Sequence, residues 1–155
     1  MAPSDFASSP SFLLSQVGAL SAQRFAAATA PCGLTPRELA VLRNILDLGP
    51  RTQQQLADEL GMHRNNMVSL IDELERKGLA RRVRSTTDRR AFDIEVTQSG
   101  RSAAECVSQL VPTLDSELVA DLSRGERSVL IDLLTRIADA AGLTSGVHPH
   151  LSSRR

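Results

Sequence analysis

A run of polar residues at the start of one predicted helix is the part of the sequence best suited to hydrogen bonding with a binding partner. Residues 63–69, HRNNMVS, place donors and acceptors on consecutive positions. Arginine suits guanine and asparagine suits adenine in the major groove, and the positive helix N-terminus favours phosphates. The alternative is local capping, but a helix needs only one N-cap. We therefore expect a DNA-contacting face made of His63, Arg64, Asn65, Asn66 and Ser69.

A second polar group lies at the tip of a predicted hairpin, in residues 85–97, STTDRRAFDIEVT. The apolar residues Phe92, Ile94 and Val96 alternate with acidic ones, which is the period of a strand with one buried face. Ordering a hairpin costs conformational entropy, and arginines at its tip repel one another. A negatively charged partner beside the tip would offset that repulsion, so we expect one there.

The charges of this region are one-sided although the whole chain is neutral, with 18 basic and 18 acidic residues. Residues 76–90 hold seven basic side chains and a single acidic one, Asp88. A solvated surface run is the alternative, but a basic stripe is what phosphate attraction requires. We expect Arg84, Arg89 and Arg90 to contact DNA, the last two at the minor groove. Asp88 is expected to hold an arginine in orientation, since phosphate repels a carboxylate.

The predicted elements form a frame that brings these two groups together. Capping boxes begin helices at Thr35 and Thr52, and a third helix over 63–77 follows a glycine turn at Gly61. Strands over 79–84 and 91–97 complete a winged helix-turn-helix, so the fold class is mostly α with a small β-hairpin. Gln53 and Gln54 open the second helix and are expected to contact the phosphate backbone, although a plain surface role explains them nearly as well.

Helices outside this winged domain carry more apolar residues than the domain needs to cover itself. We expect a disordered tail over 1–10, a dimerisation helix over 11–32, the DNA-binding domain over 34–98, two dimerisation helices over 99–142 and a flexible tail over 143–155. Packing of these helices within one chain is the alternative to a dimer.

Three segments resemble the multiple antibiotic resistance regulator (MarR) family of bacterial transcription factors. They are LTPRELAVLRNI, TQQQLADELGMHRNNMVSLIDELERKGLARR and DRRAFDIEVTQSG, and the resemblance spans about residues 12–141. Two departures are Val96, where the family has Leu, and Val68-Ser69, where it often has Thr-Arg. The resemblance implies a homodimer on a pseudo-palindromic double-stranded DNA operator, and a repressor released by a small aromatic or phenolic effector. The chain has no Trp or Tyr and only four Phe, and no pocket residue is assigned.

The composition, 41% hydrophobic and 23% charged, is that of an ordinary globular chain. No apolar run is long enough for a membrane span, and the first residues lack the pattern of a secretory signal, so we expect cytoplasmic residence without membrane contact. No nucleophile with a base, glycine-rich phosphate loop or metal-ligand cluster occurs, so we expect neither an enzyme nor a cofactor. His148 and His150 lack a third ligand, so we expect no metal.

Two cysteines, Cys32 and Cys106, lie far apart in sequence, and their spacing is compatible with free thiols in a reducing compartment. Cys32 precedes a helix start and is a candidate redox sensor, with an inert thiol as the preferred alternative. Cys106 is expected in the core. A thiol-based redox-sensing regulator and a helical protein-interaction module without DNA binding are therefore the other candidate functions. The basic stripe favours DNA binding, and the sequence does not decide between repressor and activator.

Overall fold

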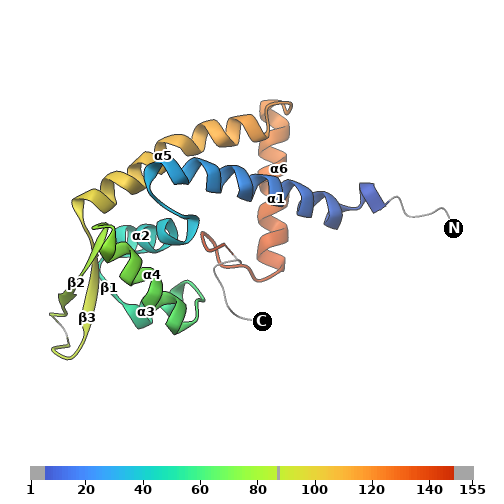
Figure 1. The fold of residues 1–155 in the computed structure, drawn as a ribbon. Coiled ribbons are helices and arrows are strands. Elements are labelled where there is room, and N and C mark those ends of the chain that lie inside the picture. The colour runs from blue at the N-terminus through green and yellow to red at the C-terminus, as the bar shows by residue number, and fades with distance from the viewer. Residues whose placement is uncertain (1–5, 87, 149–155) are drawn as a thin grey trace.

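The computed structural model describes residues 6–86 and 88–148 as six α-helices, two short 3-10 helices and a small sheet (Figure 1). The elements are η1 (Phe6–Ser8), α1 (Pro10–Thr29), η2 (Ala30–Cys32), α2 (Pro36–Leu48), β1 (Arg51–Thr52), α3 (Gln53–Glu59), α4 (Arg64–Arg76), β2 (Ala80–Arg84), β3 (Phe92–Val96), α5 (Gln98–Leu118) and α6 (Arg124–Ala140). We call residues 34–97, with the first turns of α5, the winged head. The remainder of α5, together with α1 and α6, is the helical layer.

The helices begin where their side chains satisfy free backbone N–H groups. In α2, the Thr35 N–H donates to Glu38 Oε2 at 2.7 Å and the Glu38 N–H donates to Thr35 Oγ1 at 3.3 Å. The same reciprocal pair begins α3 at Thr52 and α6 at Ser123. Each box satisfies two donors that the helix itself leaves unpaired. The capping boxes predicted from the sequence at Thr35 and Thr52 are confirmed.

The sheet is antiparallel with strand order β1-β3-β2, and the two-residue β1 was not predicted. Ile94 lies opposite Arg82 and Val96 opposite Ala80. Ile94 and Val96 are buried, as the alternation predicts, but Phe92 is 47% exposed, so the predicted buried face is wrong at that position. Phe92 lies at the end of the strand nearest the wing tip, where its ring packs under the Arg84 guanidinium at 5.5 Å instead of in the core.

The core lies almost entirely in the winged head. Leu42 of α2, Leu56 of α3, Met67 and Ile71 of α4 and Ile94 of β3 are fully buried together. This packing sets the angle between the helix-turn-helix and the hairpin.

Gly100 lets the first turn of α5 approach the winged head closely. A Cβ at this position would lie 2.0 Å from the Leu79 carbonyl oxygen, a distance that no larger residue tolerates. Thr97 caps the same turn, since its Oγ1 accepts from the Gly100 N–H at 3.1 Å and donates to the Gly78 carbonyl at 2.7 Å. The Thr-x-x-Gly motif therefore docks α5 against the end of α4.

The helical layer has little core of its own. In α1 only Thr29 is buried, and α6 has no buried residue at all. Figure 1 shows α1 and α5 side by side above the winged head, with α6 running across their direction at the far end. Large apolar side chains remain exposed on this layer: Leu13, Leu14, Val17, Leu20, Val129, Ile131, Leu133, Leu134 and Ile137.

The ends of the described chain are more ordered than the sequence suggested. Phe6–Ser8 form a 3-10 helix and Ser9 caps α1, within the segment predicted as an N-terminal tail. Val147 packs against the core, within the segment predicted as a C-terminal tail. His150 lies outside the described residues. Among those described, no group of three metal-ligating side chains occurs, and every helix is too short or too polar to traverse a bilayer.

Candidate nucleic-acid interface

Helix α4 turns a polar face to solvent because its opposite face is fixed in the core by Met67, Ile71 and Leu74. His63 is the N-cap, and its Nδ1 accepts from the Asn65 N–H at 3.3 Å. The capping explanation therefore accounts for His63. The other predicted contact residues of this helix are all exposed: Arg64, Asn65, Asn66 and Ser69.

Val68 lies on the same exposed side of α4, and the sequence prediction did not include it. It is 37% exposed among polar neighbours. Helical spacing from Arg64 and Asn65 would have identified it, since residues three and four apart share a face. An apolar side chain there suits the methyl group of thymine.

Arg82 ties the wing to the helix-turn-helix, a role that the sequence prediction missed. Its Nε donates to Gln53 Oε1 at 3.2 Å, its Nη2 to Asp72 Oδ1 at 2.7 Å and its Nη1 to Glu75. The Arg82 backbone N–H donates to Glu75 Oε1 at 2.8 Å. One half-buried side chain therefore joins β2 to both α3 and α4. No signal in the sequence showed this role, because the register that places Arg82 opposite Ile94 is known only from the structure.

The two glutamines at the start of α3 differ in their surroundings. Gln53 is half-buried and its side-chain oxygen accepts from Arg82. Gln54 is exposed, and its Nε2 donates to Asp58 Oδ1 at 3.0 Å. Gln54 is thus the better placed of the two for a phosphate, whereas Gln53 helps to position the wing.

Most of the basic stripe is neutralised within the protein. Arg76 pairs with Glu73 at 2.5 Å, Lys77 with Glu38 at 2.8 Å and Arg81 with Glu95 at 2.8 Å, and Arg82 pairs with Asp72 and Glu75. The hydrogen bond from Arg76 lowers the pKa of Glu73 below its ordinary value. Within the described part of the chain, Arg84, Arg89 and Arg90 have no acidic partner. The uncompensated charge is therefore concentrated at the wing, rather than spread over 76–90 as the sequence suggested.

The wing tip is held in shape by Asp88 and Arg84. Asp88 Oδ1 accepts from the backbone N–H of Arg90 at 2.9 Å, and the Asp88 carbonyl accepts from the Ala91 N–H at 3.0 Å. Asp88 thus orients the backbone of Arg90. Arg84 Nη1 donates to the Arg89 carbonyl at 3.0 Å, which leaves Arg89 and Arg90 as the exposed cations of the tip.

The wing and the α3–α4 pair lie at the same end of the molecule, away from α1 and α5 (Figure 1). Helix α4 packs directly against β2, and the Arg82 hydrogen bonds cross that junction. The exposed face of α4 and the wing arginines are thus neighbouring parts of one surface.

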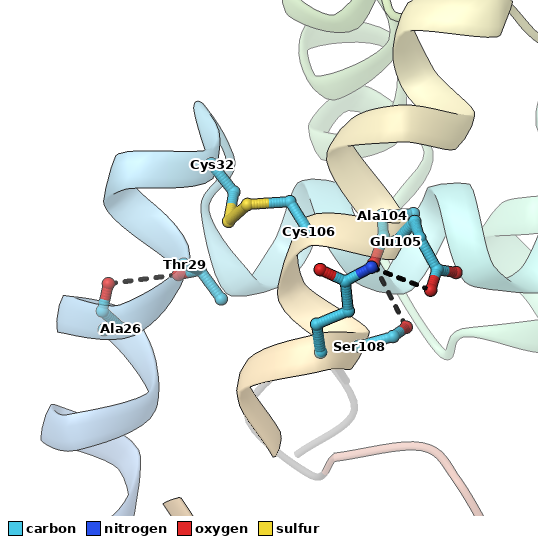
Figure 2. Close-up of a disulfide and its surroundings, with 8 residues drawn as sticks. Ala26, Thr29, Cys32, Ala104, Glu105, Cys106 and Ser108 are labelled. Atoms are coloured by element: carbon cyan, nitrogen blue, oxygen red, sulfur yellow. Dashed lines mark hydrogen bonds between the residues drawn. A yellow bond between two sulfur atoms is a disulfide. The ribbon is translucent and has the colours of Figure 1, made fainter. Parts of the chain in front are cut away.

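Cys32 and Cys106 form a disulfide, with their Cα atoms 5.9 Å apart, which joins η2 to α5 (Figure 2). The prediction of free thiols is therefore wrong. The prediction of Cys106 as a core residue is also wrong, since it is exposed, because Ala104 and Val107 take the core-facing positions of that turn. Cys32 is half-buried and packs against the core.

A small cavity lies between α1 and α5, lined by Ser21, Arg24, Phe25, Val111, Leu114, Asp115 and Leu118. Its volume of about 50 Å³ is far below the ~300 Å³ at which ligand sites begin. This cavity is therefore too small to hold an effector by itself.

Comparison with known proteins agrees with this geometry. The model of the MarR family matches residues 33–91. The transcriptional repressor CouR, in a structure bound to a 23-mer DNA duplex, is 30% identical with a TM-score of 0.75, over 89% of this chain and 98% of CouR. The chain belongs to the MarR family. A relative from Thauera aromatica, named as a transcriptional regulatory protein for the hcr operon, is 35% identical over 105 residues. That match covers 68% of this MarR-family chain and 63% of the relative's length.

A mutant MarR from E. coli complexed with operator DNA has the same fold, with a TM-score of 0.70 and 23% identity over 81% of this chain and 90% of that one. The winged head and helical layer described above are therefore the architecture of this family.

Proposed function

We propose that this MarR-family protein is a homodimeric, sequence-specific regulator of transcription that binds double-stranded DNA, acts as a repressor and resides in the cytoplasm. One observation carries the proposal. The exposed polar face of α4 adjoins the wing that bears the uncompensated arginines, so a single surface offers both base-contacting and phosphate-contacting groups.

In this proposal α4 enters the major groove. Arg64 donates to guanine, Asn65 and Asn66 pair with adenine, and Val68 and Ser69 contact neighbouring base edges. Arg89 and Arg90 lie at the adjacent minor groove, where a narrow A·T-rich segment strengthens the negative potential. Gln54 and Arg84 contact the backbone and fix the register without recognising sequence.

The relatives support DNA as the partner. CouR, at 30% identity over nearly its whole length, is a repressor bound to a DNA duplex. The alignment with CouR covers 89% of the present chain. The match to the MarR family model, over residues 33–91, contains the helix-turn-helix and the wing tip. The chain also keeps the polar face of α4 free of its own helices, as DNA binding requires.

The dimer is supported by the apolar surface of the helical layer. A folded monomer of 16.7 kDa is expected to expose about 7,600 Å², whereas this chain exposes 10742 Å². The difference of about 3,100 Å² belongs to one chain, so two chains together have about 6,200 Å² of excess surface, above the ~2,000 Å² at which obligate dimer interfaces begin. A two-fold dimer places two copies of α4 on half-sites about one helical turn, roughly 34 Å, apart, which implies a pseudo-palindromic operator.

We also propose release by a small aromatic or phenolic effector, on the strength of family membership. The cavity between α1 and α5 is too small for such a molecule, so the partner chain would have to complete the site. Hydroxybenzoates are suitable probes. The expected result is a higher melting temperature and weaker DNA binding, and no change in either across a panel of phenols would contradict this part.

Enrichment from a pool of random duplexes tests DNA binding without a known operator. We expect an inverted-repeat sequence to emerge, bound more tightly than random DNA by at least about 1000-fold, with affinity falling steeply with salt. The variant Asn65→Ala should change the enriched sequence, whereas Gln109→Ala, an exposed change on α5, should not. Failure to enrich any sequence, in a chain that is folded and dimeric, would favour a protein-interaction module.

A further inference from the structure

We infer that Val68 is a specificity-determining residue of α4, and that its side chain contacts the 5-methyl group of a thymine in each half of the operator. This inference rests on the proposed function and names the base that this part of α4 selects. Three observations carry it: an apolar side chain exposed on a polar face, its central position on that face, and the internal hydrogen bond of its neighbour Ser69.

Val68 is an apolar residue on the solvent-facing side of α4. It is 37% exposed, and among the described residues of this helix no other large apolar side chain is exposed. The core-facing side is already filled by Met67, Ile71 and Leu74, which are fully buried. Valine is also a weaker helix former than alanine, arginine or glutamine. Neither core packing nor helix propensity therefore explains a valine at this position.

Val68 lies in the middle of the exposed face. Residues three and four positions apart share one side of a helix, so Val68 follows Arg64 and Asn65 on this face. Asp72 comes next, and its Oδ1 accepts from Arg82 Nη2 at 2.7 Å, which joins the face to the wing. Recognition helices contact base edges mainly through their N-terminal residues. Val68, in the second turn, therefore lies between the polar first turn and the wing junction, where a base edge would face it.

Thymine is the standard base that presents a methyl group in the major groove. The other edges there present hydrogen-bond donors and acceptors. A valine placed against a donor or an acceptor would exclude water without replacing its hydrogen bond, which costs free energy. Against a methyl group, the same side chain buries apolar surface on both partners. Val68 therefore favours thymine over cytosine, whose C5 carries only hydrogen.

The neighbouring hydroxyl group, that of Ser69, supports the same choice of base pair. Ser69 Oγ donates its proton to the Asn65 carbonyl at 3.2 Å, so the oxygen is left to act as an acceptor. In the major groove an acceptor matches the amino group of adenine or cytosine, whereas guanine presents acceptors there. The A·T pair is the one that presents both an amino donor and a methyl group. Val68 and Ser69 together therefore suit A·T pairs under the second turn of α4.

Base analogues test the methyl contact without changing any hydrogen bond. The full chain first enriches a duplex from random sequence, and each thymine of that duplex is then replaced by deoxyuridine, which lacks only the 5-methyl group. Loss of one buried methyl contact should weaken binding about fourfold in one half-site and about fifteenfold in both. Replacement by 5-bromodeoxyuridine, whose bromine is similar in size to a methyl group, should restore most of the affinity.

Matched variants assign the methyl contact to Val68. Val68→Ala removes both side-chain methyl groups from an exposed position, and alanine is the better helix former, so the fold should be kept. This variant should bind the thymine and deoxyuridine duplexes equally. Val68→Thr keeps one methyl group and should discriminate between the two duplexes to an intermediate degree. Leu48→Ala, which removes a 53% exposed apolar side chain elsewhere on the winged head, should keep the full difference.

The outcomes separate this inference from the proposed function. An enriched duplex in which no thymine responds to deoxyuridine would overturn the methyl contact and leave DNA binding intact. A response that Val68→Ala retains in full would also overturn it, because the methyl group would then act through another residue or through the shape of the DNA. If the folded, dimeric chain enriches no sequence at all, the proposed function fails and the thymine contact fails with it.

Discussion

The winged head and the helical layer are built from the same kind of amphipathic helix, yet only the head buries its apolar residues within the chain. Met67, Ile71 and Leu74 of α4 are fully buried, whereas Ile131, Leu134 and Ile137 of α6 are 66%, 41% and 53% exposed. An apolar stripe predicts that a face will be covered, but it does not say by which chain. Four measurements would test this comparison.

The largest effect is expected from charges placed on α6. The double variant Leu134→Asp with Ile137→Asp should abolish the dimer, because two carboxylates would be buried without partners. Sedimentation at micromolar concentration measures the outcome. Leu48→Asp is the matched control, since Leu48 is 53% exposed but lies on the winged head, and it should leave the mass unchanged. A wild-type chain that sediments as a monomer would refute the dimer.

Truncation of one isoleucine in each region compares the two kinds of burial. Ile71→Ala should lower the free energy of unfolding by about 2–5 kcal/mol, as expected for a fully buried side chain. If a partner chain covers α6, Ile131→Ala should lower the free energy of unfolding by more than about 1 kcal/mol. If Ile131 remains exposed to water, the change should be smaller than about 0.5 kcal/mol. Urea denaturation at two protein concentrations distinguishes the cases.

Two arginines of the basic stripe provide a comparison within the winged head. Arg90→Ala removes a cation without an acidic partner among the described residues, so the slope of log affinity against log salt should become shallower by about 1 per chain. Arg81→Ala removes a cation already paired with Glu95 at 2.8 Å and should change that slope much less. Equal slopes for the two variants would contradict the concentration of charge at the wing.

The smallest effect concerns the start of α6. Hydrogen bonds from the Ser123 side chain and backbone lower the pKa of Glu126 below its ordinary value. The charged carboxylate therefore stabilises the folded state above the ordinary glutamate pKa, and this contribution is lost as the pH falls through the lowered value. Glu126→Gln keeps a capping partner but should show a smaller drop in melting temperature between pH 6 and pH 3. An identical drop would show that the cap does not titrate with folding.

Local signals in the sequence predicted most of the fold. Capping boxes, glycine turns and apolar spacing depend on neighbouring residues, and they located α2, α3, α4 and the hairpin within a few positions. Features that depend on distant pairs were not predictable. The Arg82 hydrogen bonds join three elements, and the Cys32–Cys106 bond joins residues 74 positions apart.

The candidate site was predicted unevenly for the same reason. The exposed face of α4 follows from helical periodicity, so Arg64, Asn65, Asn66 and Ser69 are all found at the surface. Counting charges over residues 76–90 overestimated the basic stripe, because it leaves out the acidic partners. Glu38 and Glu95 pair with the stripe from α2 and β3, and Glu73 and Glu75 pair with it from α4. Contact of any of these residues with DNA remains a prediction.

The Arg82 junction limits how this protein can adapt to different operators. The Arg82 guanidinium joins α3, α4 and β2. The distance between the base pairs that α4 contacts and those that the wing contacts is therefore fixed within each chain. Variation between binding sites must then fall in the segment that separates the two halves of the inverted repeat. Insertions inside either half of the repeat should therefore not be tolerated.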